Sequence, residues 1–102
     1  MDNADQVFDI VSRIPRGKVL TYGDIAKLTG IKNPRWVGRI LHTNIDPIEV
    51  PCHRVVNAQG KTAAAYVFGG HGVQKQRLLE EGVEFIGDTV NLSHCRAPIN
   101  MF

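Results

Sequence analysis

Residues 21–42 read Thr-Tyr-Gly-Asp-Ile-Ala-Lys-Leu-Thr-Gly-Ile-Lys-Asn-Pro-Arg-Trp-Val-Gly-Arg-Ile-Leu-His, and this segment indicates the architecture. Thr21 is typical of a helix N-cap, and Asp24, three positions later, fits the pattern of a capping box. The first helix is expected to end at Gly30. An Asn-Pro step at residues 33–34 then predicts a second start, with Asn as N-cap and Pro at the first helical position. The segment therefore predicts two short helices joined by a turn that contains glycine.

The second predicted helix, at about residues 34–42, has two faces of different character. The apolar face consists of Val37, Ile40 and Leu41, with Trp36 at its edge. The opposite face carries, at helical spacing, Arg35, Gly38, Arg39 and His42. A helix pair whose second member has a basic outer face is typical of helix-turn-helix DNA-binding motifs.

Positive charge is concentrated around this segment. Residues 12–42 hold seven of the twelve Lys and Arg residues and one of the ten Asp and Glu residues, a net charge of +6, whereas the rest carries −4. A phosphate-facing surface needs such a concentration of charge. Solvated helical faces also cluster charge, so the distribution alone leaves both readings open.

The flanking segments predict a mainly α-helical domain with one small β-hairpin. Val7, Ile10, Val11 and Ile14 form one apolar stripe of a helix over residues 4–14. Residues 73–81 predict a further helix, which ends at Gly82. Apolar residues on both sides of Ile86-Gly87-Asp88-Thr89 predict the hairpin. Residues 61–72 are rich in Ala and Gly and predict a loop, and residues 93–102 predict a loosely held tail.

The chain of 102 residues suits a single domain spanning residues 1–102. No apolar run approaches the ~20 residues of a membrane span, and the polar, acidic start is not a secretory signal. We therefore expect an intracellular location, cytoplasmic and associated with the nucleoid, or nuclear in a eukaryotic cell. Cys52 and Cys95 are expected to be free thiols. Metal-ligand spacings are absent, so we expect no metal and no cofactor.

The run Pro51-Cys52-His53-Arg54-Val55 is the candidate for chemistry. Cysteine is a strong nucleophile only as thiolate, so a neighbouring base or positive charge must lower its pKa. Adjacent side chains rarely face each other, so His53 can reach Cys52 only at a turn or through a water. A carboxylate should orient the imidazole, and the downstream candidates are Glu80, Glu81 and Glu84.

A buried, inert role for Cys52 is the alternative, since free cysteines usually behave as small hydrophobic residues. Cys95 follows His94 in the predicted tail and has the same residue types without a surrounding framework. We interpret this second pair as incidental.

Pro-Cys-His-Arg-Val resembles the active-site signature of the O6-alkylguanine-DNA alkyltransferases. Further segments that resemble this family are Gly17–Ala26, Arg35-Trp36-Val37-Gly38, Asn44 eight residues before Cys52, Tyr66-Val67-Phe68-Gly69 and Leu78–Gly82. The resemblance covers about residues 5–85. It implies a winged helix-turn-helix-like domain that binds duplex DNA in the minor groove, flips O6-alkylguanine out of the stack and transfers the alkyl group irreversibly to cysteine.

The resemblance also assigns roles. Cys52 is the alkyl acceptor, His53 a base that acts through a water, and Glu81 (or Glu80) the residue that orients His53. Tyr22 rotates the lesion phosphate and donates a proton, and Asn44 braces the turn that carries the cysteine. The DNA contacts implied are Thr21, Tyr22, Arg35 as the inserted finger, Gly38 and Arg39. The lesion pocket implied consists of Val55 through its carbonyl, Tyr66 as an aromatic wall, Phe68 and Trp36.

The chain departs from the family pattern in three ways. We expect no N-terminal domain of the family before this segment, the loop from Gly60 to Leu78 is longer, and Arg39 replaces a small residue. Short chains with a basic residue there resemble alkyltransferase-like proteins, which bind alkylated guanine without repairing it, hand it to nucleotide excision repair, and usually carry Trp or Ala in place of the cysteine. A helix-turn-helix transcription regulator with an inert cysteine is the remaining alternative. We expect a monomer whose partner is lesion-containing double-stranded DNA, with excision-repair proteins as partners in the sensor reading.

Overall fold

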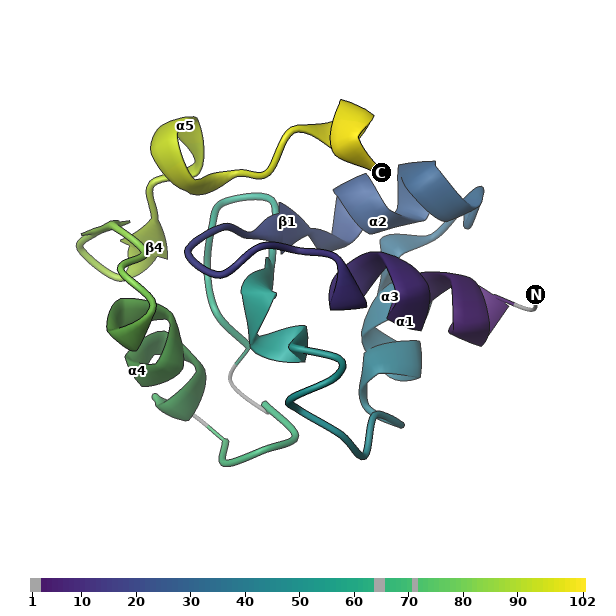
Figure 1. Cartoon of the computed structure of the whole chain (residues 1–102), viewed down its shortest axis with the longest axis horizontal. Coiled ribbons are helices and arrows are strands. Elements are labelled where there is room, and N and C mark those ends of the chain that lie inside the picture. The colour runs from purple at the N-terminus through teal and green to yellow at the C-terminus, as the bar shows by residue number, and fades with distance from the viewer. Residues whose placement is uncertain (1–2, 64–65, 71) are drawn as a thin grey trace.

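The predicted helix pair is observed as α2 (Tyr22–Thr29) and α3 (Pro34–Leu41) (Figure 1). The computed structural model describes residues 3–63, 66–70 and 72–102. Both bonds of the capping box form, because Thr21 Oγ1 accepts from the Asp24 amide and Asp24 Oδ2 accepts from the Thr21 amide, each at 3.0 Å. Gly30 ends α2 in the left-handed region at φ 76°. The start and the end predicted for this helix are confirmed.

The start of α3 is also confirmed. Asn33 Oδ1 accepts a hydrogen bond from the Arg35 amide at 3.0 Å, which satisfies one of the free donors at the helix N-terminus. Val37 and Leu41 are buried, and Ile40 packs against the same core. The apolar face of α3 therefore points inward, as its spacing predicts.

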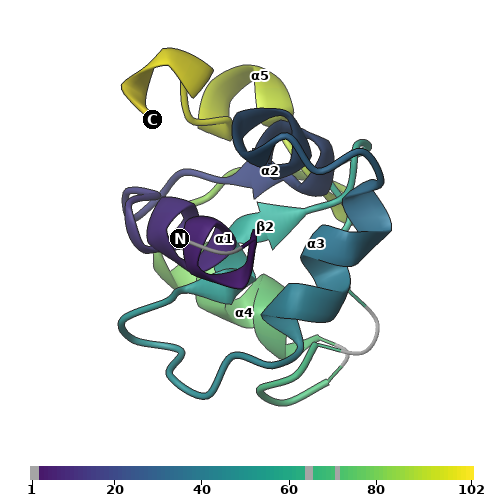
Figure 2. The ribbon, with the colours of Figure 1, turned by 90° about the vertical axis from the view of Figure 1, so that its right-hand side faces the viewer.

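Helix α1 (Asn3–Ser12) packs against both α2 and α3 and closes the first core (Figure 2). Its predicted stripe of Val7, Ile10, Val11 and Ile14 is buried. The helix ends two residues before the predicted boundary, since the next two amides bond to carbonyls three residues back instead of four. Ile14 still reaches the core from this tightened turn.

A parallel pair of two-residue strands connects the Cys52 segment to the helix-turn-helix. Strand β1 (Leu20–Thr21) pairs with β2 (Val55–Val56), with Leu20 opposite Val55. The 3-10 turn η1 (Cys52–Arg54) directly precedes β2, and β1 directly precedes α2. Because the strands are parallel, the start of α2 lies at the end of the pair where residues 57–59 follow β2. Tyr22, the first residue of α2, also lines the pocket of Cys52. Strands of two residues are too short to show an alternation of apolar and polar residues, so the sequence predicts only an extended segment here.

Helix α4 (Val73–Glu80) is followed by the hairpin of β3 (Phe85–Ile86) and β4 (Thr89–Val90), as predicted. Helix α4 lies against η1. A second core beneath it consists of Val19, Val56, Leu78, Val83, Val90 and Cys95.

The segment of residues 61–72 was expected to be a loop. Its described residues form no helix or strand, and Lys61 makes an isolated bridge with Thr89. Residues 64, 65 and 71 lie outside the described part of the chain.

The prediction of a loose tail at residues 93–102 is wrong. Helix α5 (Leu92–Cys95) leads into a segment that brackets Val19, whose amide donates to the Cys95 carbonyl and whose carbonyl accepts from the Ala97 amide, both at 2.8 Å. A last 3-10 turn, η2 (Ile99–Met101), follows. Cys95 is a buried residue of the second core, and its sulfur accepts a bond from the Glu84 amide. The contacts of Val19 with the tail span more than 70 residues, so no local sequence pattern predicts them.

An ion pair holds this tail to α2. Arg96 Nε donates to Asp24 Oδ2 at 2.9 Å, and Arg96 Nη2 bonds the other carboxylate oxygen. Asp24 is 1% exposed, and burial by itself raises its pKa. Hydrogen bonds from Arg96 and Thr21, together with the positive charge of Arg96, outweigh burial and lower the pKa. One carboxylate therefore both caps α2 and anchors the C-terminal segment.

No helix among the described residues is long and apolar enough to cross a membrane.

Replacing Arg96 with Met should lower the free energy of unfolding by about 1–3 kcal/mol, because the buried Asp24 carboxylate loses two charge-assisted hydrogen bonds. The matched control is Arg13→Met, whose exposed pair with Asp9 on α1 is worth about 0.5 kcal/mol or less. Urea denaturation of both variants measures the difference. Equal small losses would show that the tail is not anchored in this way.

Candidate active site

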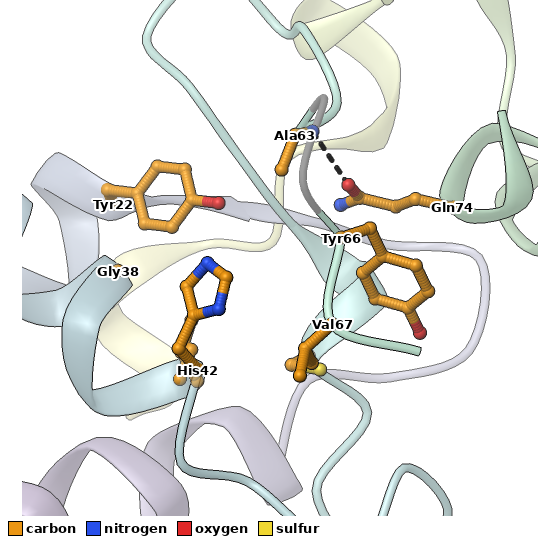
Figure 3. A pocket seen from close by; sticks show the side chains of 9 residues that line it. Tyr22, Gly38, His42, Ala63, Tyr66, Val67 and Gln74 are labelled. Carbon is orange, nitrogen blue, oxygen red and sulfur yellow. Dashed lines mark hydrogen bonds between the residues drawn. The ribbon is translucent and has the colours of Figure 1, made fainter. Parts of the chain in front are cut away.

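Cys52 lies at a small pocket where the helix-turn-helix meets α4. The pocket has a volume of about 80 Å³ and is lined by Tyr22, Gly38, Leu41, His42, Cys52, Ala63, Tyr66, Val67 and Gln74. In Figure 3 the rings of Tyr22 and His42 extend into a space that Tyr66 and Gln74 border on the other side. Four segments far apart in the sequence thus converge on one sulfur atom.

The thiol of Cys52 is buried, with 6% of the residue exposed. Burial raises its pKa, while hydrogen bonds from Asn44 and Tyr66 and the charge of Arg77 act in the opposite direction without cancelling the effect. Cys52 is therefore a protonated thiol at neutral pH, and its reaction as a nucleophile requires a base.

Asn44 fixes the segment that leads to the cysteine. Its Nδ2 donates to the Val50 carbonyl at 2.8 Å, and its Oδ1 accepts from the Asp46 amide at 3.1 Å. Asn44 also acts to lower the pKa of the Cys52 thiol. The geometry is that of a brace, the arrangement expected from the resemblance.

Glu81 is held by two cationic or polar partners in the turn. Its Oε2 lies 2.8 Å from His53 Nε2, and the Arg54 guanidinium donates to both of its oxygens at 2.9 and 2.8 Å. Burial alone would raise the pKa of Glu81, but the bonds from Arg54 and His53 outweigh it and hold the pKa at about 2. Glu81, and not Glu80, is therefore the ionised carboxylate against the histidine.

Arg54 was not among the predicted site residues. Besides Glu81 it reaches the Ile14 carbonyl at 2.7 Å, so it ties the cysteine turn to the end of α1. The position of Arg54 directly after Cys52 and His53 is a signal in the sequence, but the sequence does not show which groups Arg54 binds.

The state of His53 follows from its surroundings. Burial lowers its pKa more than Glu81 raises it, so the imidazole is neutral at pH 7. An ionised carboxylate can only accept, so Nε2 must carry the proton and Nδ1 must hold the lone pair. Nδ1 is buried and has no hydrogen-bond partner among the described residues. The ring thus has a free basic nitrogen in the interior.

Gln74 is a second residue that sequence reasoning missed. Its Nε2 donates to the carbonyls of His53 and Val55 at 3.0 and 2.8 Å, and its Oε1 accepts from the Ala63 amide at 2.8 Å. It therefore joins the cysteine turn to the loop. Helical spacing places Gln74, Arg77 and Glu81 on one face of α4, but a polar face looks like a solvated one in sequence.

Three residues predicted for the pocket have side chains that do not line it. Trp36 is 53% exposed and stacks with the Arg39 guanidinium, 5.0 Å from the ring centroid, on the outer surface of α3. The edge position of Trp36 on the helix turns it outward, so its assignment to the pocket is corrected. Phe68 packs edge-on against Tyr66 behind the pocket wall. Val55 is fully buried in β2, and its carbonyl accepts from Gln74.

The expected DNA contacts divide into two groups. Arg35, Gly38 and Tyr22 line a shallow depression beside the turn of residues 57–59, and Arg35 and Arg39 are exposed. Thr21 is buried, and its hydroxyl is engaged as the N-cap of α2, so its role as a DNA contact stays a prediction. No group of His, Cys, Asp and Glu in the described part of the chain could hold a metal ion.

Comparison with known proteins gives a consistent result. Residues 2–83 match the family model described as 6-O-methylguanine DNA methyltransferase, DNA binding domain. Alkyltransferase-like protein 1 of Schizosaccharomyces pombe is 42% identical over 80 residues, which are 78% of this chain and 74% of the relative. A methylated-DNA--protein-cysteine methyltransferase of Methanothermobacter thermautotrophicus is 42% identical over 80% of this chain but only 45% of its own length.

A solved structure agrees with these relatives. The crystal structure of S. pombe Atl1 in complex with damaged DNA containing O6-carboxymethylguanine superposes with a TM-score of 0.79 at 35% identity, covering 94% of each chain. Fold and site thus define a DNA-binding domain of the alkyltransferase class. The chain belongs to the O6-alkylguanine-DNA alkyltransferase family.

Replacing Glu81 with Gln should cost about 3 kcal/mol at pH 7, because Arg54 loses its buried carboxylate partner. The native pKa of Glu81 is about 2 against an ordinary 4.5, so its ionised form stabilises the fold fully above pH 4.5. That contribution is lost as the pH falls toward 2, and the gap between wild type and variant should narrow. Urea denaturation at pH 7, 4 and 3 measures it.

Glu80→Gln is the matched control, since this neighbouring side chain is exposed and should change stability by less than about 0.5 kcal/mol. A gap for Glu81→Gln that stays constant from pH 7 to pH 3 would contradict the depressed pKa.

Proposed function

We propose that the protein is a single-turnover DNA repair transferase that moves the alkyl group of O6-alkylguanine irreversibly to Cys52. The observation that carries the proposal is the arrangement at the pocket. A cysteine lies beside a neutral histidine whose Nε2 is fixed by an ionised glutamate and whose Nδ1 is free. This is the order of nucleophile, base and orienting group that covalent catalysis requires.

Double-stranded DNA is the proposed partner, and an intracellular location is proposed with it. Residues 12–42 concentrate the positive charge, and Arg35 and Arg39 project from α3. A lesion occurs in any sequence context, so contacts to phosphates and shape suit the task better than readout of base edges. In the family's minor-groove mode, Arg35 is the finger that enters the duplex and offsets part of the cost of unstacking the flipped base.

The proposed chemical step balances as follows. His53 Nδ1 takes the thiol proton of Cys52 through a bridging water, and the sulfur attacks the alkyl carbon on O6. The new S–C bond forms as the C–O6 bond breaks, and the electron pair of that bond goes to O6. The leaving guanine takes a proton from the Tyr22 phenol, whose own pKa burial raises, so that it stays protonated at neutral pH.

Entry of a base must enlarge the pocket. Its volume of about 80 Å³ is well below the ~300 Å³ of typical small ligand sites. The described residues Ala63, Tyr66 and Val67 form its wall on the loop side, and the Val55 carbonyl behind them has a second lone pair for the guanine. We propose that this loop, and not the helix-turn-helix core, adjusts to the base.

A non-catalytic lesion sensor that recruits nucleotide excision repair is the second candidate. It is favoured by the raised pKa of the buried Cys52 and by the alkyltransferase-like relative, which this chain matches over most of that protein's length. A cysteine that directly precedes a histidine bonded to an ionised glutamate favours the transferase.

Incubation with a duplex containing O6-methylguanine should add one methyl group to the protein, mapped by peptide mass to Cys52. Cys52→Ser should bind the duplex and gain no mass. Cys95→Ser is the matched control and should be methylated like wild type, because this second thiol lies in the other core. Tight lesion binding by wild type without any gain of mass would reject transfer and support the sensor.

Replacing Arg35 with Ala should weaken binding to the lesion duplex by roughly 10- to 100-fold, since the flipped state loses the side chain that fills the gap. Arg13→Ala removes one charge from the same basic segment and should have a much smaller effect, because Arg13 pairs with Asp9 on α1. Fluorescence of a base analogue opposite the lesion reports flipping directly. Equal effects of the two variants would contradict the proposal that Arg35 is the side chain that enters the duplex.

A further inference from the structure

Arg77 is the middle member of the polar face of α4 that Gln74 and Glu81 complete. Gln74 bonds to carbonyls of the cysteine turn and Glu81 to its side chains, whereas Arg77 turns toward the pocket wall. Its Nη1 donates to the Tyr66 hydroxyl at 3.0 Å. Within the described part of the chain, Arg77 forms no ion pair with a carboxylate, in contrast to Arg54 and Arg96.

The direction of this hydrogen bond constrains the Tyr66 hydroxyl. A guanidinium is only a donor, so the phenol oxygen accepts from Arg77 and keeps its own proton for another acceptor. Tyr66 is 6% exposed and lines the same pocket as Cys52, and a hydrogen bond from its hydroxyl is among the influences that lower the pKa of the Cys52 thiol. Arg77 is therefore bonded to a hydroxyl that borders the pocket of the sulfur.

Apart from Arg77, the groups around the sulfur do not supply a positive charge that could balance a Cys52 thiolate. Tyr22 and Asn44 are neutral, and His53 is neutral at pH 7. Arg54 is paired with the negatively charged Glu81 beside Nε2 of His53, so its positive charge is already balanced. His42 lines the mouth of the pocket on an exposed helix end. Arg77 is the cation whose charge lowers the pKa of the Cys52 thiol, and it is bonded to Tyr66 in the pocket wall.

We propose that Arg77 is a positioning residue of the alkyl-transfer site, which acts through the Tyr66 hydroxyl to stabilise the Cys52 thiolate. The inference rests on the proposed transfer to this cysteine. His53 removes the thiol proton. The Tyr66 hydroxyl, polarised by the positive charge of Arg77, then donates a hydrogen bond to the Cys52 thiolate. The base and the stabilising donor are thus separate side chains from separate elements.

The rate of Cys52 alkylation by iodoacetamide across pH tests this without DNA. Replacing Arg77 with Met keeps the apolar stem and should move the profile up by about one pH unit, so that labelling at pH 7 slows roughly tenfold. Arg77→Lys should recover part of the loss. Lys75→Met removes a charge from the same helix, where Lys75 faces Asp88 and Phe85, and should leave the profile unchanged.

Tyr66→Phe separates a relay from a direct charge effect. Because Arg77 acts through the hydroxyl, Tyr66→Phe should reproduce the shift, and the double variant should add little to either single change. Circular dichroism spectra and melting curves that match wild type establish that the variants fold. An unchanged iodoacetamide profile in folded Arg77→Met, or fully additive shifts, would overturn the proposal.

Single-turnover methyl transfer from an O6-methylguanine duplex then tests the link to repair. Arg77→Met should slow transfer by the same factor as labelling, with lesion affinity unchanged. If wild type transfers nothing while the iodoacetamide shift is observed, the proposed transferase function fails and the effect of Arg77 on the thiol stands. If wild type transfers and Arg77→Met transfers equally fast, the positioning role fails and the proposed function stands.

Discussion

The buried ion pair of Glu81 with Arg54, shared with His53, is the interaction on which the site depends. It joins the end of α4 to the turn that carries Cys52, and Arg54 extends it to the end of α1. A buried carboxylate is tolerated only when its partners are complete, and here both oxygens are used. The same contact that satisfies the charge therefore fixes the tautomer of the histidine and the position of the nucleophile.

Helix α4 thus serves as a polar scaffold and the helix-turn-helix as an apolar one. One face of α4 reaches three different parts of the site through Gln74, Arg77 and Glu81. The β1–β2 pair connects the two scaffolds, and Tyr22 at the start of α2 lines the same pocket as Cys52. In the proposed function, lesion binding relies mainly on α2 and α3, and alkyl transfer relies on the polar contacts of α4.

The sequence predicted the helices, their caps and the hairpin because these depend on local rules. Thr21 and Asp24 are three residues apart, and the apolar stripe of α3 repeats every turn. The pair of Cys52 and His53 was predicted from the short, specific run of residues 51–55. The candidates for the carboxylate that orients His53 were reduced to Glu80, Glu81 and Glu84. The docked tail, the Arg54 partner and the Gln74 bonds were beyond prediction, since they join residues 19 to 78 positions apart by polar contacts without periodicity. Trp36 was misplaced because an edge position on a helix does not say to which side the ring turns.

The protonation state of His53 is the central claim on which the proposed chemistry depends. Long-range proton–nitrogen correlation spectra of nitrogen-15-labelled protein report which ring nitrogen carries the proton. The account predicts a neutral imidazole at pH 7 with the proton on Nε2 and a free Nδ1, and loss of this single tautomer in Glu81→Gln. An imidazolium at pH 7, or a proton on Nδ1, would contradict it.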